Sequence, residues 1–235
     1  MNQSWTESTK PQVDFLIDRM GLKGGERILD LACGYGRHAL EFAKRGFDVV
    51  GVDITTDYVE YANRQAEDGG LSARFIRSDI REVGFENEFD VVLNMADGAV
   101  GYLENDEENL KIFRVVSRAL KPGGHHFMDI VSGDYADTHF PCRLWEAGEK
   151  GLTLSGFGWD RETRIMLYGQ LDYPYGEILP KPEMDLWNPT RLYTVEEVRS
   201  IMDSVGMTFV EAYADVHGAP ASANGIQLMA FSRKR

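Results

Sequence analysis

Short apolar runs alternate with amphipathic runs over the first 130 residues of the chain. Each apolar run is bounded by Gly or Asp, which is typical of strands buried on both faces of a parallel sheet. These predicted strands are residues 27–32, 48–53, 74–79, 89–94 and 125–130. Apolar residues recur at helical spacing between and before them, and the predicted helices are residues 10–20, 37–45, 55–68 and 105–120. Strand–helix alternation with short connections predicts a doubly wound α/β sheet.

The pattern changes beyond residue 130. Residues 151–193 are rich in Gly, Pro and aromatic residues, and runs at 152–159 and 164–173 flank a short polar turn. This arrangement predicts an antiparallel hairpin followed by an irregular, proline-containing path. We expect the region to be an inserted cap over the edge of the sheet.

The C-terminal segment returns to the pattern of the core. Thr194 and Glu197 fit a capping box at the start of a helix. The strand-like runs 208–216 and 226–232 are too close for a helical crossover, so we expect them to pair antiparallel. The predicted fold is α/β: a Rossmann-like, doubly wound seven-stranded sheet with a C-terminal antiparallel pair and an inserted antiparallel β cap. The predicted divisions are residues 1–139 for the core, 140–193 for the cap and 194–235 for the segment that completes the core.

The charge balance narrows the classes of partner. The 235 residues include 25 Lys and Arg against 38 Asp and Glu, a formal net charge of −13. Nucleic acids and anionic membranes both attract basic proteins, so neither is an expected partner. We recognise neither a signal peptide nor an apolar run that could span a membrane. Cys33 and Cys142 have neither disulfide nor zinc spacing, so we expect a cytoplasmic protein without a bound metal.

The most informative segment joins the first predicted strand to the next helix. It contains Gly34 and Gly36, which let the backbone approach a ligand closely and adopt positive φ. The helix that begins at Arg37 offers free N–H groups and the positive end of its dipole to an anion. The second strand ends at Asp53, where a carboxylate can accept hydrogen bonds from both hydroxyls of a ribose. A purely structural turn without a ligand is the alternative.

Two ligand classes fit this turn. The spacing Gly34-x-Gly36-x-x-Ala39 satisfies the dinucleotide-binding pattern, so a nicotinamide-dependent oxidoreductase is one reading of the segment. Asp30 favours a ligand with an ammonium group, because its carboxylate would repel a pyrophosphate. The segment from Asp30 to Gly36 resembles motif I of the class I S-adenosylmethionine-dependent methyltransferases. Ala32 stands where that motif often has its first glycine.

Further segments of residues 25–130 resemble this family in the expected order. The resemblance implies that Asp53 binds the ribose of S-adenosylmethionine, that segment 78–80 holds adenine, and that segment 94–95 lines the methionine and sulfonium end. It implies a methyltransferase with S-adenosylmethionine as cofactor; a binding module that has lost turnover is a second alternative. The expected cofactor-binding residues are Asp30, Ala32, Gly34, Gly36, Arg37, Asp53, Ile54, Ser78, Asp79, Ile80, Asn94 and Met95.

Methyl transfer is an in-line displacement, for which the protein mainly supplies alignment and exclusion of water. A base is needed only where the acceptor must lose a proton, as a hydroxyl must. The candidates for a catalytic role are His217, beside a predicted strand end, and Asp97, just beyond the fourth strand. The respective alternatives are a surface histidine and an aspartate that caps a turn.

The acceptor side is expected to be the cap. Its Trp and Tyr residues suit a mostly apolar small-molecule pocket, whereas a homodimerisation arm is the alternative. Residues 91–103 resemble the corresponding stretch of small-molecule N-methyltransferases, including those that act on aminosugars, without deciding between N- and O-transfer. We therefore expect a small, cationic, amphipathic acceptor. The residues expected to contact it are Trp5, Tyr102, His139, Trp159, Tyr168 and Arg191.

Overall fold

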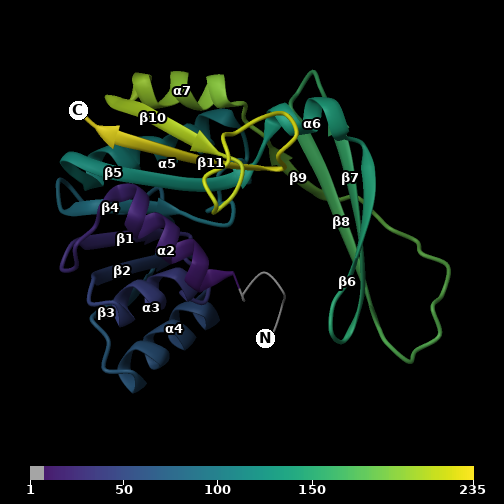
Figure 1. The fold of residues 1–235 in the computed structure, drawn as a ribbon, viewed down its shortest axis with the longest axis horizontal. Coiled ribbons are helices and arrows are strands. Elements are labelled where there is room, and N and C mark those ends of the chain that lie inside the picture. Colours follow the sequence, from purple (N-terminus) through teal and green to yellow (C-terminus); the bar gives the residue numbers. More distant parts are fainter. Residues whose placement is uncertain (1–7) are drawn as a thin grey trace.

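The computed structural model of the protein describes residues 8–235 and contains two β-sheets (Figure 1). The larger sheet has seven strands in the order β10-β11-β5-β4-β1-β2-β3. Its strands are β1 (Arg27–Leu31), β2 (Asp48–Asp53), β3 (Ala73–Arg77), β4 (Phe89–Asn94), β5 (Leu120–Val131), β10 (Met207–Tyr213) and β11 (Gln227–Lys234). Strands β1 to β5 are parallel, and β11 pairs antiparallel with both β5 and β10. The predicted seven-stranded sheet with its C-terminal antiparallel pair is confirmed.

Helices cover both faces of this sheet. They are α2 (Thr9–Met20), α3 (Arg37–Lys44), α4 (Thr56–Asp68), α5 (Asp106–Ala119) and α7 (Val195–Ser204). Side chains of α2, α3 and α4 form a buried cluster with one face of the sheet, and those of α5 and α7 form a second cluster with the other face. The central strands contribute apolar side chains to both clusters, as a doubly wound sheet requires. No helix in residues 8–235 has the length and apolar character needed to cross a membrane.

Local sequence determines where two of these helices start. The Asn105 side chain precedes α5 and accepts a hydrogen bond from the backbone N–H of Glu108 at 3.0 Å. Thr194 and Glu197 form the capping box predicted at the start of α7. Thr55 precedes α4 without a side-chain cap hydrogen bond.

The second sheet is antiparallel and has the strand order β6-β7-β8-β9. Its strands are β6 (Cys142–Ala147), β7 (Gly151–Asp160), β8 (Ile165–Pro174) and β9 (Asn188–Arg191), and we refer to them as the cap sheet. The pair β7–β8 is the predicted hairpin. The sequence pattern did not predict β6, β9 or α6 (Gly133–His139), which joins β5 to the cap sheet. β6 is almost entirely exposed and β9 has only four residues, so neither has the buried periodicity from which strands are predicted.

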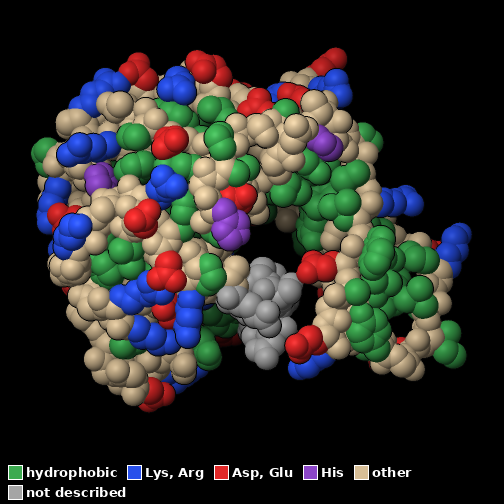
Figure 2. All heavy atoms as spheres, viewed as in Figure 1, with side chains coloured by type: hydrophobic (Ala, Val, Ile, Leu, Met, Phe, Trp, Pro, Cys, Tyr) green, Lys and Arg blue, Asp and Glu red, His purple; other side chains and the backbone are tan. Residues whose placement is uncertain are grey.

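The two faces of the cap sheet differ. One face packs aromatic side chains against α6 in a third buried cluster, where the rings of Phe140 and Phe157 stack with centroids 4.8 Å apart. On the opposite face, a Cβ added to Gly156 would lie 2.5 Å from the sulfur of Met184, so the crossing loop lies directly on the strand backbone. A hollow separates the distal part of the cap sheet from the core (Figure 2). Since β5 leads into α6 and the cap sheet, the carboxyl ends of the core strands face this hollow (Figure 1).

Gly51, in the middle of β2, tests how tightly the core is packed. A Cβ added there would lie 2.4 Å from the ring of Phe75 and 2.9 Å from the sulfur of Cys33. We expect Gly51→Ala to lower the free energy of unfolding by about 1–3 kcal/mol, measured by urea denaturation, because a dense interior does not accommodate an extra methyl group. The control Gly84→Ala, where nothing lies within 4 Å, should change it by less than about 0.5 kcal/mol. Equal effects of the two substitutions would contradict this packing.

Candidate functional site

Strand ends meet at the edge of the core that faces the cap sheet. β1 and β2 pair in parallel, and their carboxyl ends carry the glycine turn and Asp53. Asp53 joins the two ends: its Oδ2 accepts a hydrogen bond from the N–H of Gly34 at 2.8 Å, and its Oδ1 accepts one from Thr55 at 2.9 Å. A carboxylate has about four acceptor positions, so Asp53 can still accept hydrogen bonds from a ligand.

The glycine turn consists of residues in left-handed conformations. Ala32, Gly34 and Gly36 have φ values of 56°, 55° and 76°. A Cβ at Gly36 would lie 2.7 Å from the ring of Phe75, so this position needs glycine for space as well as for conformation. Ala32 adopts a conformation that favours glycine, at a cost of roughly 1–2 kcal/mol. Gly36 precedes α3 without a side-chain cap, which leaves N–H groups of the first turn available at the edge.

The end of β3 carries the segment predicted to hold adenine. Arg81 binds the Asp79 carboxylate through its backbone N–H at 2.8 Å and its guanidinium at 2.5 Å, and this contact holds the pKa of Asp79 below its usual range. The Ser78 hydroxyl donates to the Asp79 carbonyl at 3.1 Å. Ile54 is 63% exposed and offers an apolar surface. Ile80 is buried in the core, and its predicted contact with the cofactor stays a prediction.

The end of β4 carries Asn94 and Met95, two residues predicted to bind the cofactor. The Asn94 side chain is fully buried: its amide donates to the Gly98 carbonyl at 3.0 Å, and its Oδ1 lies 3.2 Å from Nε2 of His126. Met95 is buried in the cluster formed with α2 and α3. The side chains of Asn94 and Met95 therefore have structural roles, while their backbone borders the edge. Their predicted part in cofactor binding stays a prediction.

Asn94 holds an unusual turn in place. Residues 96–99 all have positive φ, between 52° and 69°, and three of the four are not glycine. Such backbone costs about 1–2 kcal/mol per residue and tends to occur at functional sites. In this turn the N–H of Asp97 donates to the carbonyl of Asp129 in β5 at 2.7 Å, which ties the ends of β4 and β5 together.

Two buried carboxyl groups flank Arg37 at the same edge. Asp30 and Asp129 are 2% and 5% exposed, and within residues 8–235 Oδ2 of Asp30 and Oδ1 of Asp129 have no hydrogen-bond partner. Burial raises the pKa of each group to about 7, an effect that nearby Arg37 partly offsets. Arg37 also donates to Thr9 and Gln12 of α2, at 3.0 and 2.8 Å. The sequence prediction missed Asp129, for which a carboxylate inside an apolar strand was the available signal.

Asp97 and Tyr102 extend the polar edge toward the cap sheet. The Tyr102 hydroxyl donates to Oδ2 of Asp97 at 2.9 Å. Burial raises the pKa of both groups, and the charge of Asp97 raises that of Tyr102 further, so the phenol remains a donor. Tyr168 of β8 contributes to the electrostatic surroundings of Tyr102. The N–H of Arg191 in β9 donates to the Gly101 carbonyl at 2.8 Å, so the loop is joined to the cap sheet.

A polar row continues along the cap sheet from Tyr168. The Tyr168 hydroxyl donates to Oε1 of Gln170 at 2.6 Å. The Gln170 amide donates to Asp172 at 2.8 Å, and the Thr153 hydroxyl donates to Asp172 at 2.7 Å. Tyr168 is paired with Phe157, and alternate residues of a strand share one face. The row therefore extends the inner, core-facing side of the cap sheet beyond its junction with α6.

Three of the residues predicted to contact the acceptor have partners within the protein. The His139 ring stacks on that of Tyr135. Nε1 of Trp159 donates to Asp137 at 3.2 Å. The Arg191 guanidinium lies 2.5 Å from a carboxylate oxygen of Glu197, with Asp106 as a second acidic neighbour at 3.5 Å. Their present contacts explain each of them without an acceptor.

His217 is exposed in the loop after β10, and its backbone N–H donates to Asp215 at 2.8 Å. Since β10 runs parallel to β5, the loop lies at the same edge as the other strand ends. The catalytic role of His217 stays a prediction. Trp5 lies outside the described residues, so its contact also stays a prediction. Within residues 8–235, His, Cys, Asp and Glu form no group of three or more that could hold a metal ion.

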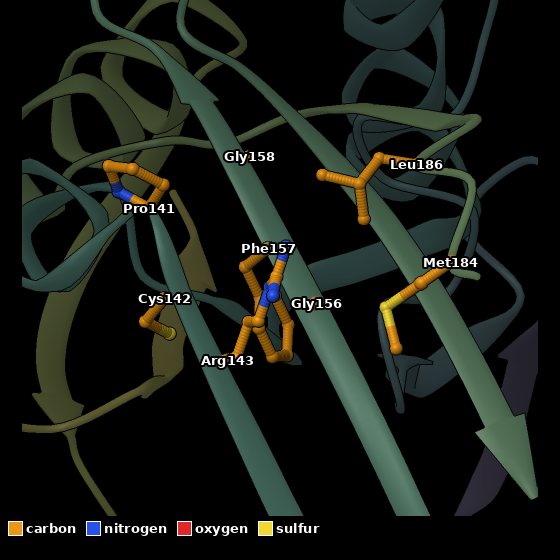
Figure 3. Close-up of a pocket in the computed structure, with 8 residues that line it drawn as sticks. All are labelled: Pro141, Cys142, Arg143, Gly156, Phe157, Gly158, Met184 and Leu186. Atoms are coloured by element: carbon orange, nitrogen blue, oxygen red, sulfur yellow. The ribbon is translucent and has the colours of Figure 1, made fainter. Parts of the chain in front are cut away.

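A cavity of about 590 Å³ lies between the loop after β4 and the β8–β9 part of the cap sheet, lined in part by Tyr102 and Ile165. A second cavity, of about 370 Å³, lies on the cap sheet itself. Figure 3 shows Cys142, Phe157 and Met184 around it. Tyr102 joins the first cavity to the strand ends, whereas the lining of the second comes from the cap sheet and its surroundings.

Comparison with known proteins identifies the core. Residues 28–124 match the family of methyltransferase domains. The chain is 25% identical over 231 residues to the Bacillus subtilis protein named "Putative methyltransferase YqeM", covering 98% of this chain and 88% of that protein. Residues 28–124 are therefore a methyltransferase domain. The alternative of a nicotinamide-dependent oxidoreductase is therefore set aside.

Solved methyltransferases share the fold of this chain. The CcbJ methyltransferase of Streptomyces caelestis aligns with a TM-score of 0.79 at 16% identity, covering 97% of this chain and 95% of that one. CalS10, an amino pentose methyltransferase of Micromonospora echinaspora, aligns with a TM-score of 0.69 at 17% identity, covering 100% and 93%. Both alignments include the cap sheet as well as the core, because they extend over nearly the whole methyltransferase.

The raised pKa values of Asp30 and Asp129 predict how the stability of the methyltransferase depends on pH. An unfolded carboxyl group titrates near 4, so between pH 4 and 7 the folded state holds protons that the unfolded state releases. Stability therefore falls as the pH rises. Between pH 5 and 8 we expect a loss of up to about 2–3 kcal/mol for each group, measured by chemical denaturation.

A double variant, Asp30→Asn with Asp129→Asn, should remove most of this loss. The control is Asp90→Asn at the opposite edge of the sheet, where Arg27 and Lys121 bind the carboxylate. It should keep the pH dependence of the wild type. An unchanged slope in the double variant would contradict the assignment.

Proposed function

We propose that this methyltransferase binds S-adenosylmethionine along the carboxyl ends of β1 to β4. It transfers the methyl group to a small, polar molecule that binds in the hollow between the core and the cap sheet. The observation that carries the proposal is the continuity of the polar side chains. They begin at Asp53, pass through the buried carboxyl groups to Asp97 and Tyr102, and continue as the row that ends at Asp172. Donor and acceptor positions therefore adjoin.

Each part of the donor meets a suitable group in this proposal. Asp53 accepts the ribose hydroxyls while it holds the glycine turn, and Ile54 packs on adenine with Asp79 at its rim. The unpartnered oxygen of Asp30 accepts a hydrogen bond from the donor ammonium. Arg37 and the first turn of α3 suit the donor carboxylate. The donor brings an activated methyl group, so these residues orient it and exclude water.

The wall available to an acceptor is more polar than the aromatic composition of the cap suggests. Phe157 and Trp159 pack at the junction with α6, whereas Gln170 and Asp172 extend beyond it. Such a row offers hydrogen-bond donors and acceptors to a hydroxylated molecule. The similarity of fold to an amino pentose methyltransferase supports an acceptor of this kind, and the net charge of −13 disfavours nucleic acid.

We also propose that the protein forms a homodimer, through strand β6 and not through the inner side of the cap sheet. Strand β6 is an unpaired edge of the cap sheet with exposed Leu144 and Trp145. Exposed apolar edge strands favour pairing with another chain. A second copy would therefore pair there, on the side of the cap sheet away from β9.

Asp53 tests the donor site. In Asp53→Asn an amide NH₂ replaces one acceptor oxygen and opposes the N–H of Gly34 or Thr55, so both the turn and the ribose contact weaken. We expect the affinity for S-adenosylmethionine, measured by calorimetry, to fall by about 1–3 kcal/mol. The control Asp48→Asn carries the same change at the other end of β2, where the side chain is exposed, and should bind normally. Unchanged binding by Asp53→Asn would contradict the ribose assignment.

Asp172 tests the acceptor wall. A screen of small hydroxylated acceptors, read by release of S-adenosylhomocysteine, first supplies a substrate. With that substrate, Asp172→Asn should raise KM at least about fivefold, roughly 1 kcal/mol, with donor affinity unchanged. The control Glu149→Gln, at the exposed β6–β7 turn, should leave KM unchanged. Efficient methylation of tRNA or rRNA by the pure protein would contradict a small acceptor.

A further inference from the structure

One oxygen of the Asp129 carboxyl group has no hydrogen-bond partner within residues 8–235, and the donor contacts proposed above do not supply one. Its side chain is buried, and within residues 8–235 its Oδ1 accepts no hydrogen bond. Burying a charged group without a partner is costly, and unsatisfied buried groups in native proteins call for an explanation such as a ligand or a catalytic role. The chemistry that would satisfy Asp129 is a hydrogen-bond donor, and the surrounding charges define which kind.

Asp129 lies on β5, the strand next to β4, whereas the proposed donor site comprises the carboxyl ends of β1 to β4. Met128 is paired in register with Asn94, the last residue of β4, so Asp129 is level with the loop that contains the left-handed turn. Asp97 in this turn binds the Asp129 carbonyl through its N–H, and its own carboxylate contributes to the electrostatic surroundings of Asp129. Tyr102 binds the Asp97 carboxylate and connects it to the cap side. The two carboxyl groups therefore lie between the donor edge and the acceptor wall.

The groups around Asp129 leave an excess of negative charge. Asp97 faces it from the turn after β4 and Arg37 faces it from α3. Asp30, on β1, shares Arg37 with it. On the other side β11 contributes Met229, which is uncharged. Asp30 and Asp129 thus share one guanidinium, and Asp97 adds a further carboxyl group beside Asp129, so a cationic ligand would balance the charge.

We propose that Asp129 and Asp97 bind the ammonium group of an amine acceptor, and that Asp129 takes the proton which the amine must lose before it attacks. This inference rests on the proposed function, in which the donor occupies the neighbouring strand ends. The freed lone pair of the nitrogen forms the N–C bond to the methyl group as the C–S bond breaks. The electron pair of that bond stays on sulfur, which becomes a neutral thioether.

The proton remains on Asp129 until it passes to water when the products leave. A carboxyl group whose pKa is about 7 can take up and release a proton near neutral pH, as a general base must. The methylated nitrogen is again an ammonium ion, and the Asp97 carboxylate stabilises the charge that forms on it during transfer.

A pair of donor analogues tests this assignment without a known acceptor. Sinefungin carries an ammonium group in place of the transferable methyl, whereas S-adenosylhomocysteine has neither group. We expect the wild type to bind sinefungin at least about tenfold more tightly, and Asp129→Asn to reduce this preference at least about fivefold. The affinity of this variant for S-adenosylhomocysteine should stay within about twofold. The control Asp90→Asn should keep the full preference.

Three results of these binding and screening experiments would overturn the inference. Equal weakening of both analogues by Asp129→Asn would assign Asp129 to the amino-acid end that they share, and no change in either would remove it from the site. In the acceptor screen, preference for alcohols over matched amines would also contradict it. A wild type that bound none of S-adenosylmethionine, S-adenosylhomocysteine and sinefungin would instead refute the proposed function.

Measurements on the wild type keep the test decisive if Asp129→Asn does not fold. The preference for sinefungin over S-adenosylhomocysteine should rise at least about threefold from pH 6 to pH 8, as Asp129 loses its proton. Asp30 titrates in the same range. Because it faces the α-ammonium group that both analogues carry, its effect on the two affinities is the same and cancels in their ratio. Asp97 contributes in the same direction as Asp129, while Arg37 stays charged throughout. A ratio that does not change with pH would overturn the inference.

Discussion

The position of Arg37 between two buried carboxyl groups is the interaction on which the functional edge depends. A cation at the first residue of a helix is unfavourable toward the helix dipole, and burial makes it more so. Asp30 and Asp129 offset this cost, and Arg37 in turn makes their burial tolerable. Because Arg37 also donates to Thr9 and Gln12, the same group connects α2 and α3 to the ends of β1 and β5.

The two loops at this edge are shaped by different side chains. The glycine turn is stabilised by the neighbouring strand, because the Asp53 carboxylate accepts a hydrogen bond from the N–H of Gly34. The left-handed turn after β4 is stabilised by its own strand, because the Asn94 amide donates a hydrogen bond to the Gly98 carbonyl. Oδ1 of Asn94 contacts His126. Burial lowers the pKa of His126 to about 3, so this contact involves a neutral imidazole and does not change near neutral pH.

Much of the core could be predicted because its signals are local. Strands buried on both faces are continuous apolar runs, and the glycine turn and the acid that ends β2 lie within about 20 residues of one another. Asn94 shows what such reasoning does not determine. Successive strand residues face opposite sides, and Leu93 lies in the cluster with α2 and α3, so Asn94 is directed toward the other, buried face. Sequence position placed it at the strand end without showing this orientation.

The remaining misses depend on contacts between distant segments. Asp129 acquires its environment from β1, α3 and the turn after β4, which no local pattern contains. Strand β9 forms because four residues pair with β8, and α6 packs against the aromatic face of the cap sheet. Composition indicated that the cap is aromatic, but it did not indicate that Trp159 would be held by Asp137 at the junction.

The close contact between Gly156 and the loop at Met184 has a consequence for how this enzyme diverges. At Gly156 and Gly169 that face of the cap sheet tolerates no added side chain, because the loop lies on the backbone itself. The inner row, including Gln170 and Asp172, is exposed and contributes little to the stability of the sheet. Substitutions that alter acceptor preference can therefore accumulate on one side of a two-faced sheet, while the other side preserves its shape and the core retains the donor.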